Sequence, residues 1–378
     1  MSANIPCVAV PLIVEGNVPV IILNFKRPNG GWRKARFLFD SGGGAVIFSR
    51  SLADDLDLKQ TGPVIVDDDG SRYFPTRTPQ MWLGNLRLDH GPVRTVIAAS
   101  NDFDPRDSVD GIFPSRLLKS YDVLINYPGH IFAMSRPGGI FHRGRALKSP
   151  YLASIYHPRI EICIDGISYG MLLDTGSKMT LVRRDLMDSW VSKHRRWNSA
   201  KGAVGPANMT GSAEEVDELL LRVPELRLDG FSVHNVVLLS RRDAIYTSSS
   251  QDMTAPIVGS LGGNVLSNFI VEIDYPKQIT YFRLVQQTKR DNFDTVGLVL
   301  APSPLGHFVI RSISPDASAQ TLANLRVGDL ILSIAGSDPL SLTEAALALS
   351  GKPGEVKRIT ILRGNAELHI RVTVAHIL

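Results

Sequence analysis

Two short stretches of the chain place an aspartate at the end of an apolar run, directly before a small hydroxyl residue and a glycine. "RFLFDSGGGAVIFSR" (36–50) contains Asp40, and "GMLLDTGSKMTLVR" (170–183) contains Asp174. One such turn would be ordinary, because Asp and Gly are turn-forming residues. Its recurrence in the same apolar surroundings suggests a site with two carboxylates. The other candidate residues of the two turns are Ser41, Gly42, Thr175, Gly176 and Ser177.

Two carboxylates a few ångströms apart cannot both ionise comfortably, so they share a proton and titrate in two separate steps. The ionised member can act as a general base on a water molecule, while the protonated member donates to a substrate carbonyl. An amide bond can then be hydrolysed without a covalent enzyme intermediate. The glycines allow the tight bends that such turns need, and the Ser41 and Thr175 hydroxyls can hold the turns in place.

The elements around the two turns also repeat, between residues 1–135 and residues 155–285. Each copy has a predicted β-hairpin before its aspartate, with Asn29-Gly30 or Asp165-Gly166 at the turn. A short helical segment follows each aspartate turn. The closing segments "YDVLINYP" and "FIVEIDYP" align residue against residue. The sequence therefore predicts two copies of one β-rich lobe of about 130 residues.

Both aspartate turns resemble the active-site turns of aspartic proteases, and each copy resembles a lobe of the retropepsin-like bacterial aspartyl proteases. In that family a later glycine-led turn and short helix follow the aspartate. "VGSLGGNVL" of the second copy matches both family glycines with Gly259 and Gly262. "DGIFPSRLL" of the first copy matches with Gly111, but Pro114 replaces the second glycine. Gly43 makes the first turn looser than the family pattern, which suggests an asymmetric pair.

The resemblance implies that Asp40 and Asp174 are the catalytic pair of a pepsin-like enzyme with two fused lobes. It also implies that a β-hairpin flap covers the pair. The flap candidates are Asp69, Gly70 and Ser71 in the first copy and Val204 and Gly205 in the second.

The pattern changes from about Asp291, where short strands surround one or two short helices. "FVIRSISPDASAQTLANLRVGDLILSIAG" resembles a bacterial PDZ domain, with a turn at Gly328-Asp329 and with Ala319 and Leu325 at small and apolar core positions. The resemblance implies that "TVGLVL" binds the carboxylate of a peptide C-terminus, and that the peptide adds to the sheet as a strand. The candidate residues of this loop are Val296, Gly297, Leu298 and Val299.

Composition excludes several other functions. The net charge of +4 is not concentrated in a patch, so no nucleic-acid partner is expected. Two cysteines, Cys7 and Cys163, form neither a disulfide framework nor a cysteine metal site. The acidic run 67–69 lacks the ligand spacing of a calcium loop, and the nine histidines form no recognised metal motif. We therefore expect no cofactor and no metal.

No apolar stretch of 18 residues exists, so no membrane span is expected. No signal peptide is visible at the N-terminus. The compartment stays open: periplasmic or secreted if a leader was removed, and cytoplasmic otherwise.

Together these observations predict a mainly β protein with two acid-protease lobes, at residues 1–148 and 149–287, and an α+β PDZ domain at residues 291–378. The predicted function is that of a monomeric aspartic endopeptidase acting on proteins or peptides, with a peptide C-terminus as a second ligand. The alternatives are an inactive peptide-binding or regulatory protein with the same fold, and an adaptor that uses the PDZ domain alone. Because each lobe carries its own apolar strands, we expect the lobes to fold without residues 291–378.

Overall fold

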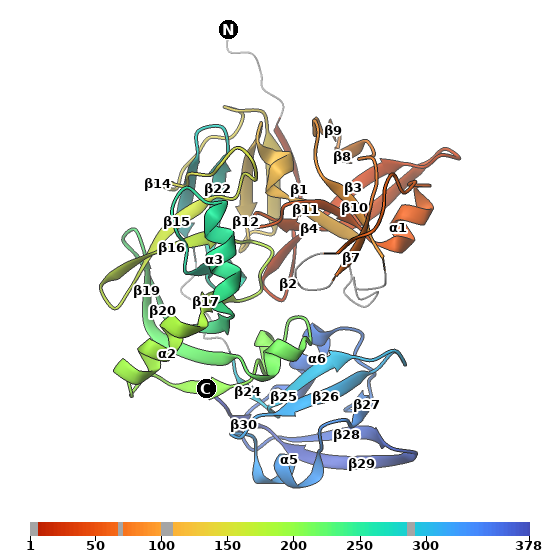
Figure 1. Cartoon of the computed structure of the whole chain (residues 1–378), viewed down its shortest axis with the longest axis vertical. Helices are drawn as coiled ribbons and strands as arrows, with labels where there is room; N and C mark the ends of the chain where they lie inside the picture. Colours follow the sequence, from red (N-terminus) through yellow and green to blue (C-terminus); the bar gives the residue numbers. More distant parts are fainter. Residues whose placement is uncertain (1–6, 67–70, 100–108, 286–291) are drawn as a thin grey trace. The chain divides into compact units, whose positions relative to one another are not determined.

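The computed structural model describes residues 7–66, 71–99, 109–285 and 292–378 of the 378-residue chain (Figure 1). The protein is mainly β, as predicted. It divides into two compact units. The first comprises Met1–Ser177, Arg227–Phe231 and Thr247–Gln287, and the second comprises Lys178–Leu226, Ser232–Tyr246 and Thr288–Leu378. The second predicted lobe is thus divided between the units, whereas both candidate aspartates belong to the first.

The largest sheet of the first unit is built from the first copy of the repeat. Its order is β6-β7-β10-β5-β11-β4-β3-β8-β9, and β2 pairs with β3. Phe25, Phe37 and Phe48 pack together on one side of it, with ring centroids 5.5–5.7 Å apart. The elements are β2 (Ile13–Glu15), β3 (Val18–Lys26), β4 (Trp32–Asp40), β5 (Val46–Phe48), α1 (Arg50–Asp55), β6 (Ile65–Val66), β7 (Arg72–Pro75), β8 (Met81–Leu83), β9 (Leu86–Arg87), β10 (Thr95–Ala98), β11 (Gly111–Pro114) and the 3₁₀ helix η1 (Ser115–Leu118).

A six-stranded sheet combines strands from both copies. Its order is β1 (Cys7–Pro11), β13 (Ile131–Ser135), β12 (Asp122–Asn126), β22 (Phe269–Asp274), β23 (Ile279–Leu284) and β14 (Arg145–Lys148). β12 and β22 are the two closing strands that align in the sequence, and they are antiparallel neighbours at the centre of this sheet (Figure 1). This shared sheet explains why no unit boundary falls at residue 148.

The second copy begins with the hairpin of β15 (Arg159–Ile164) and β16 (Ile167–Leu173) in the first unit. Asp165 and Gly166 both have positive φ angles, +53° and +77°, as a type I′ turn requires. β16 pairs in parallel with β21 (Gly259–Leu261), just as β4 pairs in parallel with β11. α4 (Gly263–Leu266) follows β21. The predicted repeat is therefore visible in the strand pairing.

Further elements of the second copy continue the same topology. β17 pairs in parallel with β20, as β5 pairs in parallel with β10 in the first copy. The elements are β17 (Thr180–Arg183), α2 (Arg184–Lys193), β18 (Ser199–Lys201), the 3₁₀ helices η2 (Gly205–Ala207) and η3 (Ala213–Val216), β19 (Leu219–Leu228), β20 (Phe231–Arg241) and α3 (Asp243–Gln251).

The C-terminal segment forms an antiparallel sheet in the order β25-β26-β27-β28-β29, and β24 pairs with β30. Leu325 is buried in its core, as expected. Ala319 was also expected there but is exposed at the start of its helix, and Ala317 is buried instead. The elements are β24 (Asp294–Thr295), β25 (Leu298–Pro302), β26 (Phe308–Ile313), α5 (Ala319–Asn324), β27 (Leu330–Ile334), α6 (Leu342–Leu349), β28 (Val356–Arg363), β29 (Ala366–Thr373) and β30 (Ala375–His376).

Within the second unit, the C-terminal segment shares one hydrophobic core with the second copy of the repeat. Phe293, Val299 and Ile377 pack in the same cluster as Val204 and Leu239, and all five are buried. This shared core argues against the expectation that the rest of the chain folds independently of residues 291–378, which stays a prediction to be tested. None of the helices in the described ranges is both long and apolar enough to cross a bilayer.

Candidate active site

Asp40 and Asp174 stand at equivalent places in the two copies. Asp40 is the last residue of β4, and Asp174 directly follows β16. Each of these strands has a parallel neighbour that fixes where it ends. Pro114 of β11 is the register partner of Asp40, and its extended backbone (φ −87°, ψ 163°) accommodates the proline. In the second copy the Asp174 N–H donates to the Leu261 carbonyl at 3.1 Å.

The two aspartate turns are joined by reciprocal hydrogen bonds. The Ser41 N–H donates to Thr175 Oγ1, and the Thr175 N–H donates to Ser41 Oγ, each at 3.0 Å. Each hydroxyl then donates onward to the strand before the opposite turn: Ser41 Oγ to the Leu173 carbonyl at 2.6 Å, and Thr175 Oγ1 to the Phe39 carbonyl at 2.8 Å. Both side chains are fully buried. The hydroxyls therefore hold the two aspartates at a fixed separation.

The glycines of the turns leave room for the carboxyl groups. A Cβ atom on Gly42 would lie 3.0 Å from the Asp174 carboxyl, and one on Gly176 would lie 2.5 Å from Asp40 Cγ. Each glycine thus faces the aspartate of the other copy. A Cβ on Gly43, the residue that makes the first turn looser than the family pattern, would lie 2.7 Å from Asp40 Oδ2. A side chain at any of these positions would displace a carboxyl group.

The surroundings of Asp40 favour its protonated form. Burial raises the pKa of Asp40 to about 8, and the negative charge of Asp174 adds to this shift. The hydrogen bond between the two carboxyl groups acts in the same direction, whereas the N–H groups of Gly42 and Gly43 lower the Asp40 pKa. The Gly42 N–H donates to Asp40 Oδ1 at 2.8 Å. These surroundings therefore favour a proton on the pair, and Asp40 is the candidate proton donor.

Asp174 has more donors that stabilise its charged form. Burial raises the pKa of Asp174, but the Gly176 and Ser177 N–H groups and the nearby Ser260 hydroxyl oppose the rise. The two N–H groups donate to Asp174 Oδ1 at 3.1 and 3.2 Å. The hydrogen bond with Asp40 also lowers the Asp174 pKa. The pair can thus supply a general base at Asp174 and a proton donor at Asp40, and each residue keeps some exposure to solvent.

Three further residues near the pair were not among the candidates from the sequence. The buried hydroxyls of Tyr127 and Tyr275 have no hydrogen-bond partner in the part of the chain that the structure describes. Burial raises the pKa of both, and the charges of Asp174 and Asp40, respectively, add to the shift. Burial lowers the pKa of His157, and the nearby backbone of Gly43 opposes this shift. The matched closing segments, each with a tyrosine before a proline, were the one signal that could have singled out the tyrosines.

The predicted flap residues occupy different surroundings. Asp69 and Gly70 lie outside the described residues, and Ser71 directly precedes β7, which pairs with β6 in an antiparallel hairpin. Val204 and Gly205 belong to the second unit. Val204 is fully buried in the core shared with the C-terminal segment. A Cβ atom on Gly205 would lie 3.7 Å from the Thr295 side chain.

The predicted carboxylate-binding loop is enclosed by protein. Val296, Leu298 and Val299 are buried, and Gly297 has a positive φ of +86°. The Val296 N–H donates to the Leu349 carbonyl at the end of α6. The Gly297 carbonyl accepts from the Ser314 N–H at 2.8 Å. The Val296 N–H and the Gly297 carbonyl are thus already engaged within the unit.

Asn208 occupies the edge of the C-terminal sheet. β25 is an edge strand of that sheet, and the Leu300 N–H donates to Asn208 Oδ1 at 2.8 Å. The Asn208 amide donates back to the Leu300 carbonyl at 3.0 Å. Glu215 holds the same loop, because its carboxylate accepts from the N–H groups of Met209, Thr210 and Gly211. Asn208 therefore bonds to Leu300 as an added strand would.

Comparison of the chain with protein-family models and with curated proteins gave no match.

Proposed function

We propose that the protein is an aspartic endopeptidase in which Asp174 activates a water molecule and Asp40 protonates the substrate carbonyl. The single observation that carries this proposal is the coupled pair of carboxyls, held by the reciprocal hydrogen bonds of Ser41 and Thr175. The opposed surroundings of the two aspartates match the opposed roles that amide hydrolysis needs. The mainly β fold with its duplicated topology supports two acid-protease lobes.

The proposed substrate class is a polypeptide in extended conformation. No Cys or His nucleophile is required, because water attacks the substrate carbonyl directly. The tetrahedral intermediate then collapses as a proton passes to the leaving amine. We further propose that the C-terminal domain is a PDZ-like module that binds peptide C-termini. Its edge strand β25 is where a peptide would add, and Asn208 holds the Leu300 position of that edge.

The test is hydrolysis of an unstructured protein and of a peptide library by the purified full chain. D40N and D174N should each reduce kcat by at least about a thousandfold, because either leaves the pair without one role. D54N is the matched control, since Asp54 is exposed on α1. If the wild type binds peptides without cleaving them, the protein is instead a binding protein that retains the carboxyl pair. Cleavage by D40N and D174N at the wild-type rate would overturn the assignment.

A further inference from the structure

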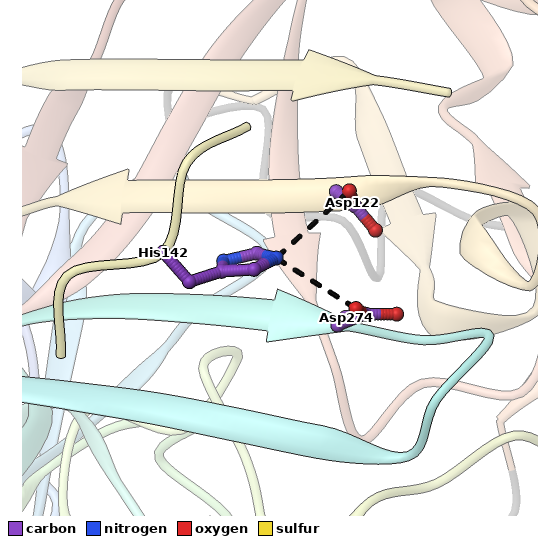
Figure 2. Close-up of side chains that lie close together, drawn as sticks. All are labelled: Asp122, His142 and Asp274. Atoms are coloured by element: carbon purple, nitrogen blue, oxygen red, sulfur yellow. Dashed lines mark ion pairs between the residues drawn. The ribbon is translucent and has the colours of Figure 1, made fainter. Parts of the chain in front are cut away.

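A second cluster of carboxylates lies in the six-stranded sheet. Asp122 on β12 and Asp274 on β22 are register partners across the antiparallel pair, and both are fully buried. His142, from the segment between β13 and β14, points its ring between them (Figure 2). Its Nε2 lies 3.9 Å from Asp122 Oδ2 and 3.7 Å from Asp274 Oδ2.

The cluster carries more negative charge than its neighbours compensate. Like charges directly opposite each other on paired strands are destabilising, and buried carboxylates need a cation or hydrogen-bond donors. Asp274 pairs with Lys277 at 2.7 Å, although that lysine is mostly exposed. Asp122 Oδ2 accepts from the Gly138 N–H at 2.8 Å. Asp122 Oδ1 is buried and has no hydrogen-bond partner within the described ranges.

Two further contacts fix the orientation of the His142 ring. Its Nδ1 lies 3.1 Å from Glu272 Oε2, and Glu272 is almost fully buried. Tyr281 stacks on the ring at 4.3 Å between centroids. A carboxylate at Nδ1 favours the proton on that nitrogen, so that the Nε2 lone pair faces the two aspartates. This is the arrangement in which metal-ligating histidines are usually held.

We propose that Asp122, His142 and Asp274 bind a divalent transition-metal ion, with Zn²⁺ as the ion whose preferences fit best. Zn²⁺ accepts imidazole and carboxylate ligands at about 2.0–2.2 Å. Ligand atoms on a tetrahedron of that size lie about 3.4 Å apart, which is close to the two Nε2–Oδ2 distances. Mg²⁺ and Ca²⁺ prefer oxygen ligands alone. Because Asp122 and Asp274 come from different copies of the repeat, the ion would cross-link the two copies at one end of the central strand pair of their shared sheet.

The test is calorimetric titration of chelator-treated full-length protein with Zn²⁺. One equivalent should bind, and the melting temperature should rise with the Zn²⁺ concentration. D122N and H142A should each weaken binding more than about a hundredfold, and E272Q by about 10–100-fold, because Glu272 only positions the histidine. Co²⁺ should give visible absorption bands that H142A abolishes.

Two controls separate this site from other sources of binding. The double variant C7S/C163S removes both thiols. Cys7 matters most, because it is the register partner of Ser135, and Ser135 is also the register partner of Asp122. This variant should keep the full stoichiometry. K277A should bind Zn²⁺ at least as tightly as wild type, because the lysine competes for Asp274. Absence of Zn²⁺ and Co²⁺ binding by wild type, or unchanged binding by D122N and H142A, would overturn the proposal. Absence of binding is measured on the wild-type protein alone, so the proposal can be overturned even if the variants do not fold.

Discussion

Ser41 and Thr175 each donate a backbone N–H to the hydroxyl of the other, at 3.0 Å in both directions. Neither hydrogen bond can form without the other turn in place, because that turn supplies its acceptor. Both residues are fully buried. The position of each aspartate therefore depends on the other copy of the repeat as well as on its own.

The first prediction concerns this pair of hydrogen bonds. T175V keeps the shape of the side chain but leaves the Ser41 N–H and the Phe39 carbonyl without partners. Since each buried group left unsatisfied costs about 1–3 kcal/mol, the free energy of unfolding should fall by about 2–4 kcal/mol. Urea denaturation measures it. T175S retains the hydroxyl and should stay within about 1 kcal/mol of wild type; equal stabilities of T175V and T175S would contradict the structure.

The second prediction concerns the pH dependence of hydrolysis. The proposed mechanism needs a proton on Asp40 and a negative charge on Asp174. Because the pKa of Asp40 is raised to about 8, kcat/KM should decline as the pH rises above about 8. It should also decline in acid as Asp174 becomes protonated, which gives a bell-shaped profile for the pair as a unit. Activity that keeps rising through pH 9 would exclude Asp40 as the proton donor.

The third prediction concerns stability at different pH values. The fold favours protonated Asp40, so the contribution of this group is fully present below the pKa of unfolded aspartate, about 4. It is lost as the pH rises through about 8. D40N removes this loss and should be more stable than wild type at pH 8, by more than about 1 kcal/mol, since one pKa unit corresponds to about 1.4 kcal/mol.

Urea denaturation at a series of pH values measures this difference, and the advantage of D40N should shrink toward pH 4. D54N should follow wild type throughout. A D40N protein less stable than wild type at pH 8 would show that Asp40 is charged in the folded state.

The fourth prediction concerns removal of the C-terminal segment. A chain ending at residue 291 loses Phe293, Val299 and Ile377 from the shared core and exposes Val204 and Leu239. We expect loss of the cooperative thermal transition and increased binding of a hydrophobic dye. The point variant V299D should show the same defect in milder form, whereas L305D, at an exposed position, should not. A truncated chain that melts at the wild-type temperature would restore the expectation of independent folding.

The fifth prediction concerns the edge of β25. N208A frees the N–H and carbonyl of Leu300. Binding of a fluorescent peptide with an apolar C-terminus should become at least about tenfold tighter. A tenfold change in Kd corresponds to about 1.4 kcal/mol, which is comparable to the contribution of one or two hydrogen bonds. Fluorescence anisotropy measures it, with circular dichroism to verify folding. Equal affinities of folded N208A and wild type would mean that Asn208 does not compete with peptide.

The repeat could be predicted from the sequence because strand and turn signals are local. The Asp165-Gly166 turn and the parallel partners of β4 and β16 follow the predicted pattern. The contacts of His142 and Asn208 could not be predicted, because they join residues that are far apart in the chain and belong to no local motif. Burial of Val299 in the predicted carboxylate-binding loop was likewise unpredictable, since this side chain packs against the second copy of the repeat.

The bonds between Ser41 and Thr175 span 134 positions of the chain. Such a long-range contact forms late in folding, after the local hairpins, because closing a long loop carries a large entropic penalty. A chain that is still being synthesised, or that has folded only its first copy, contains one isolated aspartate turn and no carboxyl pair. In the proposed peptidase, activity would therefore arise only with the completed native state, and a partly folded chain could not digest its own neighbours.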